Sequence, residues 1–184
     1  MTTDGNRTRH WFRRPLALAI VVAALAVFFL LPKAERAYPS DELYRVRGID
    51  LSSHNGDVDF KAVKADGIEF VVLKATEGAS FKDARFVRNY REAVDAGLKV
   101  GAYHFFRFDV NGTVQAMNLL HSIGSRVLDL PLMIDVEEWT NPDDVATDDV
   151  LTGLEQMVDC LADNGYRVIL YTNKAGQRRF LRDR

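Results

Sequence analysis

The stretch LPLMIDVEEW, Leu130–Trp139, decides the fold that we predict for this chain. It is apolar up to Ile134 behind one proline, and it then carries Asp135 and Glu137 with a single valine between them. This pattern indicates a short buried strand that ends in two acids. Residues two apart on a strand face the same side with Cα atoms ~6.6 Å apart, so we expect both carboxylates to project together from the strand's C-terminal end.

Two carboxyl groups that project together are typical of glycoside hydrolysis. One carboxyl stays protonated and donates to the leaving oxygen, while the other is ionised and stabilises the developing positive charge. The alternative is that Asp135 and Glu137 form the solvated start of a loop, since most acids lie at protein surfaces. The residues around this stretch are needed to choose between a catalytic pair of acids and the start of a solvated loop.

The sequence from Val46 onward predicts five units of one strand followed by one helix. The expected strands cover 46–51, 68–73, 98–103, 130–134 and 167–171, and the expected helices cover 59–65, 83–96, 113–125, 143–164 and 174–181. Parallel neighbours require crossover connections, so this alternation predicts an α/β fold with a parallel sheet and helices outside it.

Polar and aromatic residues gather where the predicted strands end. They are Asp50, Glu77, His104, Asp135 with Glu137, and Tyr171. In parallel α/β folds this carboxyl-terminal edge is where functional sites are assembled. No glycine-rich dinucleotide or phosphate loop follows a strand, and no zinc-spaced set of His and Cys occurs, so we predict neither a cofactor nor a metal.

Composition limits the class of protein further. The 184 residues carry a formal net charge of −2, which leaves no global basic field and argues against nucleic-acid binding. Their length and ordinary apolar content fit one globular domain plus an extra segment. Cys160 is the single cysteine and lies in an apolar helical pattern, so we interpret it as a structural thiol.

The extra segment is the amino terminus. Leu16–Leu31 is a run of sixteen apolar residues after a cluster of arginines, and as a helix it would be ~24 Å long. We predict a transmembrane signal anchor at 16–32 that follows a cytoplasmic basic segment at 1–15. A linker at 33–45 and an exported domain at 46–184, periplasmic or extracellular, would complete the chain. A secreted protein with a cleaved signal peptide is the alternative, although no clean small-x-small site follows the run.

Five ordered pieces of the predicted domain resemble the family 25 glycoside hydrolases, which are lysozymes of the N-acetylmuramidase type. The pieces are GIDLS at 48–52 with Asn55-Gly56 and Asp59-Phe60, FVVLKATEG at 70–78, GAYHFF at 101–106, LMIDVE at 132–137 and YTN at 171–173. The resemblance implies an irregular barrel of eight strands, with five β/α units followed by three strands without regular helices. It also implies cleavage of the β-1,4 bond between N-acetylmuramic acid and N-acetylglucosamine in peptidoglycan.

The resemblance assigns roles to three acids. Glu137 matches the general acid, and Asp135 and Asp50 match acids that line the cleft beside it. Glu137 would have to hold its proton near neutral pH, which partial burial and a nearby ionised Asp135 would both favour. Asp135 would either orient the substrate's N-acetyl group as an internal nucleophile or stabilise the oxocarbenium-like state by its charge. Both roles stay open, because the deciding carboxyl separation is a tertiary distance.

Further side chains are candidates for contact with the glycan. Four aromatic candidates could stack on sugar rings or serve as packing residues: Tyr103, Phe105, Trp139 and Tyr171. Glu77 could lie in the cleft or pair with Lys74. We expect His104 to orient a loop by hydrogen bonding.

The sequence also departs from the family's pattern. Phe60 stands where Trp is frequent and Asn55 where Gln is frequent. The sequence stops at Arg184, where the last three strands would begin, so we expect only the first five β/α units of the barrel. A monomeric muramidase that needs no cofactor is the main hypothesis. A non-catalytic peptidoglycan-binding module and a hydrolase of chitin-like glycans are the alternatives.

Overall fold

The computed structural model describes residues 44–180. The predicted basic segment, the transmembrane anchor at 16–32 and most of the linker therefore lie outside the described residues. Among residues 44–180, no helix combines the length and the apolar character needed to cross a membrane.

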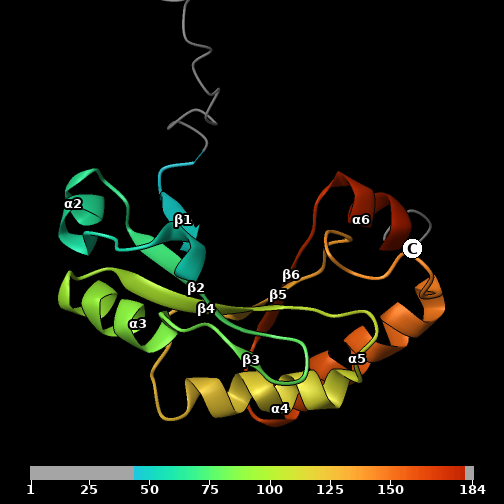
Figure 1. Ribbon diagram of the computed structural model, residues 1–184. Helices are drawn as coiled ribbons and strands as arrows, with labels where there is room; N and C mark the ends of the chain where they lie inside the picture. The colour runs from blue at the N-terminus through green and yellow to red at the C-terminus, as the bar shows by residue number, and fades with distance from the viewer. Residues whose placement is uncertain (1–43, 181–184) are drawn as a thin grey trace, which may run out of the picture. The chain divides into compact units, whose positions relative to one another are not determined.

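The centre of the described fold is a six-stranded sheet, in which β1, β2, β4, β5 and β6 are neighbours in that order and pair in parallel (Figure 1). The strands are β1 Gly48–Leu51, β2 Phe70–Glu77, β3 Phe81–Lys82, β4 Lys99–Phe105, β5 Leu132–Asp135 and β6 Val168–Tyr171. The predicted parallel α/β sheet is thus confirmed.

A helix follows each of the five parallel strands, as predicted. The helices are α2 Phe60–Ala65, α3 Phe86–Asp95, α4 Gly112–Ile123, α5 Thr147–Asp163 and α6 Lys174–Phe180, and a short 3-10 helix covers Ser53–Asn55. Local capping explains several of the starts: the Asp59 side chain accepts hydrogen bonds from the backbone N–H groups of Lys61 and Ala62, and that of Asn111 accepts one from Val114.

Strand β2 runs four residues beyond its predicted end. Residues 74–77, which the sequence predicted as an exit loop, continue the strand because they pair with β4 on one side and with β3 on the other. The register shifts between Lys74 and Thr76. The two-residue strand β3, which was not predicted, pairs antiparallel with the end of β2. A β2–β3 hairpin therefore adjoins the carboxyl-terminal edge of the sheet.

The core lies between the sheet and the helices that cover it. Leu73, Ala102 and Ile134 are fully or almost fully buried. Helices α4 and α5 approach so closely at Gly112 that an added Cβ would lie 1.7 Å from the Gly153 carbonyl oxygen. Glycine at 112 therefore lets α4 begin directly against α5.

The closed barrel implied by the resemblance is not confirmed by residues 44–180. Strands β1 and β6 form the two ends of the strand order in the described sheet. Ile169 and Leu170 on β6 are 43% and 51% exposed, so this strand is less buried than a central parallel strand.

Candidate active site

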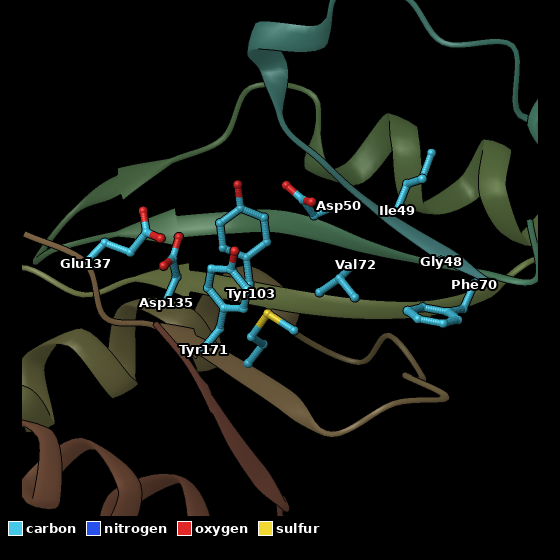
Figure 2. A pocket seen from close by; sticks show the side chains of 10 residues that line it. Gly48, Ile49, Asp50, Phe70, Val72, Tyr103, Asp135, Glu137 and Tyr171 are labelled. Atoms are coloured by element: carbon cyan, nitrogen blue, oxygen red, sulfur yellow. The ribbon is translucent and has the colours of Figure 1, made fainter. Parts of the chain in front are cut away.

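A pocket of about 320 Å³ lies along the sheet, from the first residues of β1 and β2 to the carboxyl-terminal end of β5 (Figure 2). Its polar lining consists of Asp50, Tyr103, Asp135, Glu137 and Tyr171, and its apolar lining includes Phe70, Val72 and Met133. The pocket thus brings together the three acids that sequence reasoning assigned to the cleft.

Strand register explains how these side chains meet. In the β4–β5 and β5–β6 pairs, Asp135 lies opposite Phe105 and Tyr171. Val136 is buried, and Asp135 and Glu137 on either side of it line the same pocket. Asp50 comes from β1, and β2 and β4 lie between β1 and β5 in the sheet. All three carboxylates nevertheless lie around one hollow (Figure 2).

Asp135 has the most unusual environment in the pocket. Among the side chains of residues 44–180, its Oδ1 is the one buried polar atom without a hydrogen-bond partner. Burial raises the pKa of Asp135 to about 7, and the negative charges of Glu137 and Asp50 act in the same direction, while Lys74 opposes them. Sequence reasoning expected an ionised Asp135, whereas the structure favours a protonated Asp135 up to nearly neutral pH in the unliganded pocket.

Glu77 is paired rather than directed into the pocket. The Lys74 ammonium donates to Glu77 Oε2 at 2.7 Å, and Arg107 Nη1 lies 3.7 Å from Glu77 Oε1. The same ammonium lies 5.3 Å from the ring centroids of Phe81 and of Phe105. Of the two readings of Glu77, the structure supports the ion pair with Lys74.

The aromatic candidates separate into three groups. Tyr103 and Tyr171 line the pocket, and burial together with the nearby acids raises the pKa of both phenols, which keeps them protonated as hydrogen-bond donors. Phe105 is only 5% exposed and lies against Lys74, so the structure does not bring it to the pocket. Trp139 does not line the pocket, but it is 73% exposed and comes two residues after Glu137.

Sequence reasoning missed several residues around the acids. Phe70 and Met133 were read only as strand residues and Lys74 only as a possible partner of Glu77, although period-two alternation would have placed Phe70 and Val72 on one face. Asn141 hydrogen-bonds to the backbone of Glu137 and Phe106, and Arg107 to that of Thr140. Both were missed as well, because no local pattern marks a side chain that contacts a distant backbone. No group of three or more His, Cys, Asp or Glu side chains within residues 44–180 is arranged to hold a metal ion.

A pair of acids at the carboxyl-terminal end of β5, with a third acid in the same pocket, is an arrangement suited to glycoside hydrolysis. The chain belongs to the glycosyl hydrolases family 25, whose family model matches residues 49–181. Among curated relatives, the autolytic lysozyme of Clostridium acetobutylicum is 36% identical over 127 residues, which are 69% of this chain and 38% of the relative. The N,O-diacetylmuramidase of Arthroderma benhamiae is 36% identical over 125 residues, which are 66% of this chain and 52% of the relative.

Solved structures give the same result for the fold. A family 25 glycosyl hydrolase from Bacillus anthracis superposes with a TM-score of 0.75 at 32% identity, covering 83% of this chain and 71% of that chain. The chain spans between about a third and a half of the length of the curated relatives it matches.

Proposed function

We propose that this protein is a muramidase that hydrolyses the β-1,4 bond between N-acetylmuramic acid and N-acetylglucosamine in peptidoglycan. The observation that carries the proposal is the convergence of Asp50, Asp135 and Glu137 in one sugar-sized pocket. Membership of family 25, and the lysozymes and muramidases among its relatives, support the same substrate.

Glu137 is the proposed general acid, which donates a proton to the glycosidic oxygen as the bond breaks. Asp135 acts on the other reacting centre, the anomeric carbon, where positive charge develops in the transition state. Asp50 adds a third negative charge to the pocket wall and so favours the same positive charge. The phenols of Tyr103 and Tyr171 supply hydrogen-bond donors to the sugar.

The unpartnered Asp135 Oδ1 supports one of the two roles left open for this residue. A buried acceptor without a donor matches the N–H of the substrate's N-acetyl group, and such a hydrogen bond favours the ionised carboxylate. Asp135 would then orient the acetamido oxygen of the bound glycan as internal nucleophile.

The proposal extends to the setting of the enzyme. The resemblance supports an irregular eight-stranded barrel of which β1, β2, β4, β5 and β6 are the first five strands. The arginine-flanked apolar run at 16–32 supports a single-pass membrane protein with its amino terminus in the cytoplasm and its hydrolase domain exported toward the cell wall. A monomer is sufficient, because all three proposed acids come from one chain.

A zymogram on peptidoglycan tests the proposal. Wild type should clear the gel and release reducing ends, and Glu137→Gln should lower the rate by at least about 10³-fold, since general acid catalysis and the proton it supplies are both lost. Glu138→Gln is the matched control, because this neighbouring carboxylate lies near Arg179 at 3.6 Å instead of in the pocket. Equal clearing by wild type and Glu137→Gln would remove Glu137 from the mechanism.

Two further arms of the same experiment separate the alternatives. Binding to peptidoglycan without release of reducing ends by wild type would identify a non-catalytic binding module. Faster release of reducing ends from chitin oligomers than from peptidoglycan would identify chitin-like glycans as the substrate.

A further inference from the structure

The loop that follows the proposed general acid is held by one buried amide. Asn141 is 8% exposed and comes four residues after Glu137. Its Oδ1 accepts a hydrogen bond from the Phe108 N–H at 2.9 Å, and its Nδ2 donates to the carbonyl oxygens of Phe106 at 2.9 Å and of Glu137 at 2.8 Å. A single side chain therefore ties the backbone of Glu137 to the segment that leaves β4.

The segment that leaves β4 is itself fixed. Gln115 on α4 is fully buried, and its Oε1 accepts from the Arg107 N–H at 2.8 Å while its Nε2 donates to the Arg107 carbonyl oxygen at 2.9 Å. Asn141 thus attaches Glu137 to a rigid part of the fold, because buried and fully paired amides hold their partners in one geometry.

The loop between Glu137 and Asn141 has a second anchor. Arg107 Nη1 donates to the Thr140 carbonyl oxygen at 2.6 Å. Thr140 has a φ of 62°, which a non-glycine residue adopts only when its surroundings hold it there. The Asn141 N–H also closes a turn onto the Glu138 carbonyl oxygen at 3.0 Å. The chain beyond the acid is therefore constrained at three successive points.

The carboxylate of Glu137 has no such support of its own. Within the part of the chain that the structure describes, no hydrogen bond to another residue holds it, whereas its carbonyl oxygen is bound by Asn141. The position of the acid is thus set mainly through its backbone. We propose that Asn141 is a positioning residue that places Glu137 for proton donation. This inference rests on the proposed function, because it assigns a task to Asn141 in the same reaction.

The first variant that tests the inference is Asn141→Asp. The substitution keeps the size of the side chain and the acceptor for the Phe108 N–H, but it removes both donors and places an oxygen against the carbonyl groups of Phe106 and Glu137. We expect kcat per folded molecule to fall by roughly 10- to 100-fold with KM within about threefold of wild type, since small misplacements of a reacting group have effects of this size. Both constants are measured well below the melting temperature of every variant.

Asn118→Asp is the matched control. Asn118 on α4 is also buried, and its Nδ2 donates to the carbonyl oxygens of Gly78 at 3.0 Å and of Phe81 at 3.2 Å. The substitution removes the same kind of donor from another loop. We expect a comparable loss of melting temperature with kcat within about threefold of wild type. Equal losses of kcat in both variants would overturn the inference, because they would reflect general destabilisation.

Amide hydrogen exchange separates a failure of this inference from a failure of the proposed function. Asn141→Asp should speed exchange of the N–H of residue 141, which donates to the Glu138 carbonyl oxygen, by about tenfold or more, and Asn118→Asp should leave this amide unchanged. If wild type releases no reducing ends, the proposed function fails, and faster exchange in Asn141→Asp alone would show only that Asn141 holds the loop that follows Glu137. Wild-type exchange and wild-type kcat in Asn141→Asp would overturn the inference whatever the substrate.

Discussion

His104 and Asp135 are titratable groups near the ends of neighbouring strands: His104 is fully buried, whereas Asp135 is half-buried with its Oδ1 atom buried. Asp135 lies opposite Phe105 in the β4–β5 register, so His104, one residue earlier on β4, faces the other side of the sheet. His104 faces the helices and Asp135 faces the pocket.

Every polar atom of the His104 ring is paired. Nδ1 accepts from the Thr76 hydroxyl at 2.7 Å, and Nε2 donates to Gln115 Oε1 at 2.9 Å, which fits the neutral imidazole. Burial lowers the pKa of His104 to about 4, so the ring stays neutral at physiological pH. The hydrogen bonds of His104 go to β2 and α4, and only Gln115 contacts the loop backbone at Arg107, so the predicted role of His104 in orienting a loop stays a prediction.

Asp135 is the opposite case, because burial raises its pKa to about 7 and leaves Oδ1 unpaired. A buried group that is fully paired stabilises the fold, whereas one that is left unpaired in a pocket is held ready for a ligand. Hydrogen-bond pairing in the folded state therefore distinguishes the structural residue His104 from the functional residue Asp135 better than residue type does.

Between these two residues, the largest expected effect is on activity, from Asp135→Asn. The amide keeps the size of the side chain but cannot carry negative charge, so peptidoglycan hydrolysis should fall by about 10²- to 10³-fold. Release of reducing ends measures the rate, and circular dichroism checks that the variant is folded. A rate within threefold of wild type would mean that Asp135 does not act in the reaction.

The next effect is on stability, from His104→Leu. This substitution leaves the Thr76 hydroxyl and one acceptor position of Gln115 without their partner in a dry environment, so the free energy of unfolding should fall by about 2–4 kcal/mol. Urea denaturation measures the loss. We expect kcat per folded molecule to stay within about threefold of wild type, and a selective loss of kcat without destabilisation would contradict the structural role.

The two groups should give opposite pH dependences of stability. The pKa of Asp135 is raised on folding, so its contribution to stability is lost as pH rises from about 4 to about 7. The pKa of His104 is lowered on folding, so its contribution is lost as pH falls from about 6.5 to about 4. These contributions offset each other in wild type.

Each variant removes one of the two titrating groups, so the pH dependence of its stability should report the other group. Relative to wild type, Asp135→Asn should gain stability as pH rises from 4 to 7, and His104→Leu should lose stability over the same range. Urea midpoints at each pH unit measure both slopes. Parallel curves for wild type and Asp135→Asn would show that Asp135 titrates at the same pH in the folded and unfolded chains.

The smallest expected effect comes from Trp139→Ala, in the loop between Glu137 and Asn141. Trp139 is 73% exposed, so its removal should change the melting temperature little. If the indole stacks on a sugar, KM should rise by about 2- to 10-fold, because aromatic contacts of this kind are worth about 0.5–1.5 kcal/mol beyond burial. An unchanged KM would show that Trp139 does not contact the glycan.

The sequence by itself determined the order of the five parallel strands and their helices, and the face that Asp135 and Glu137 share. These features depend on local properties: alternation along a strand, capping at Asp59, and the apolar run that ends at Ile134. They were predictable because the residues that decide them lie within a few positions of each other in the chain.

Only the tertiary structure decided that Asp50 reaches the other two acids, that Asp135 has the raised pKa, and that Phe105 covers Lys74. It also decided that Asn141 holds the Glu137 backbone to the end of β4. These features depend on burial and on distances between segments far apart in sequence. Desolvation and hydrogen bonding act across such distances only after folding, so no local pattern records them.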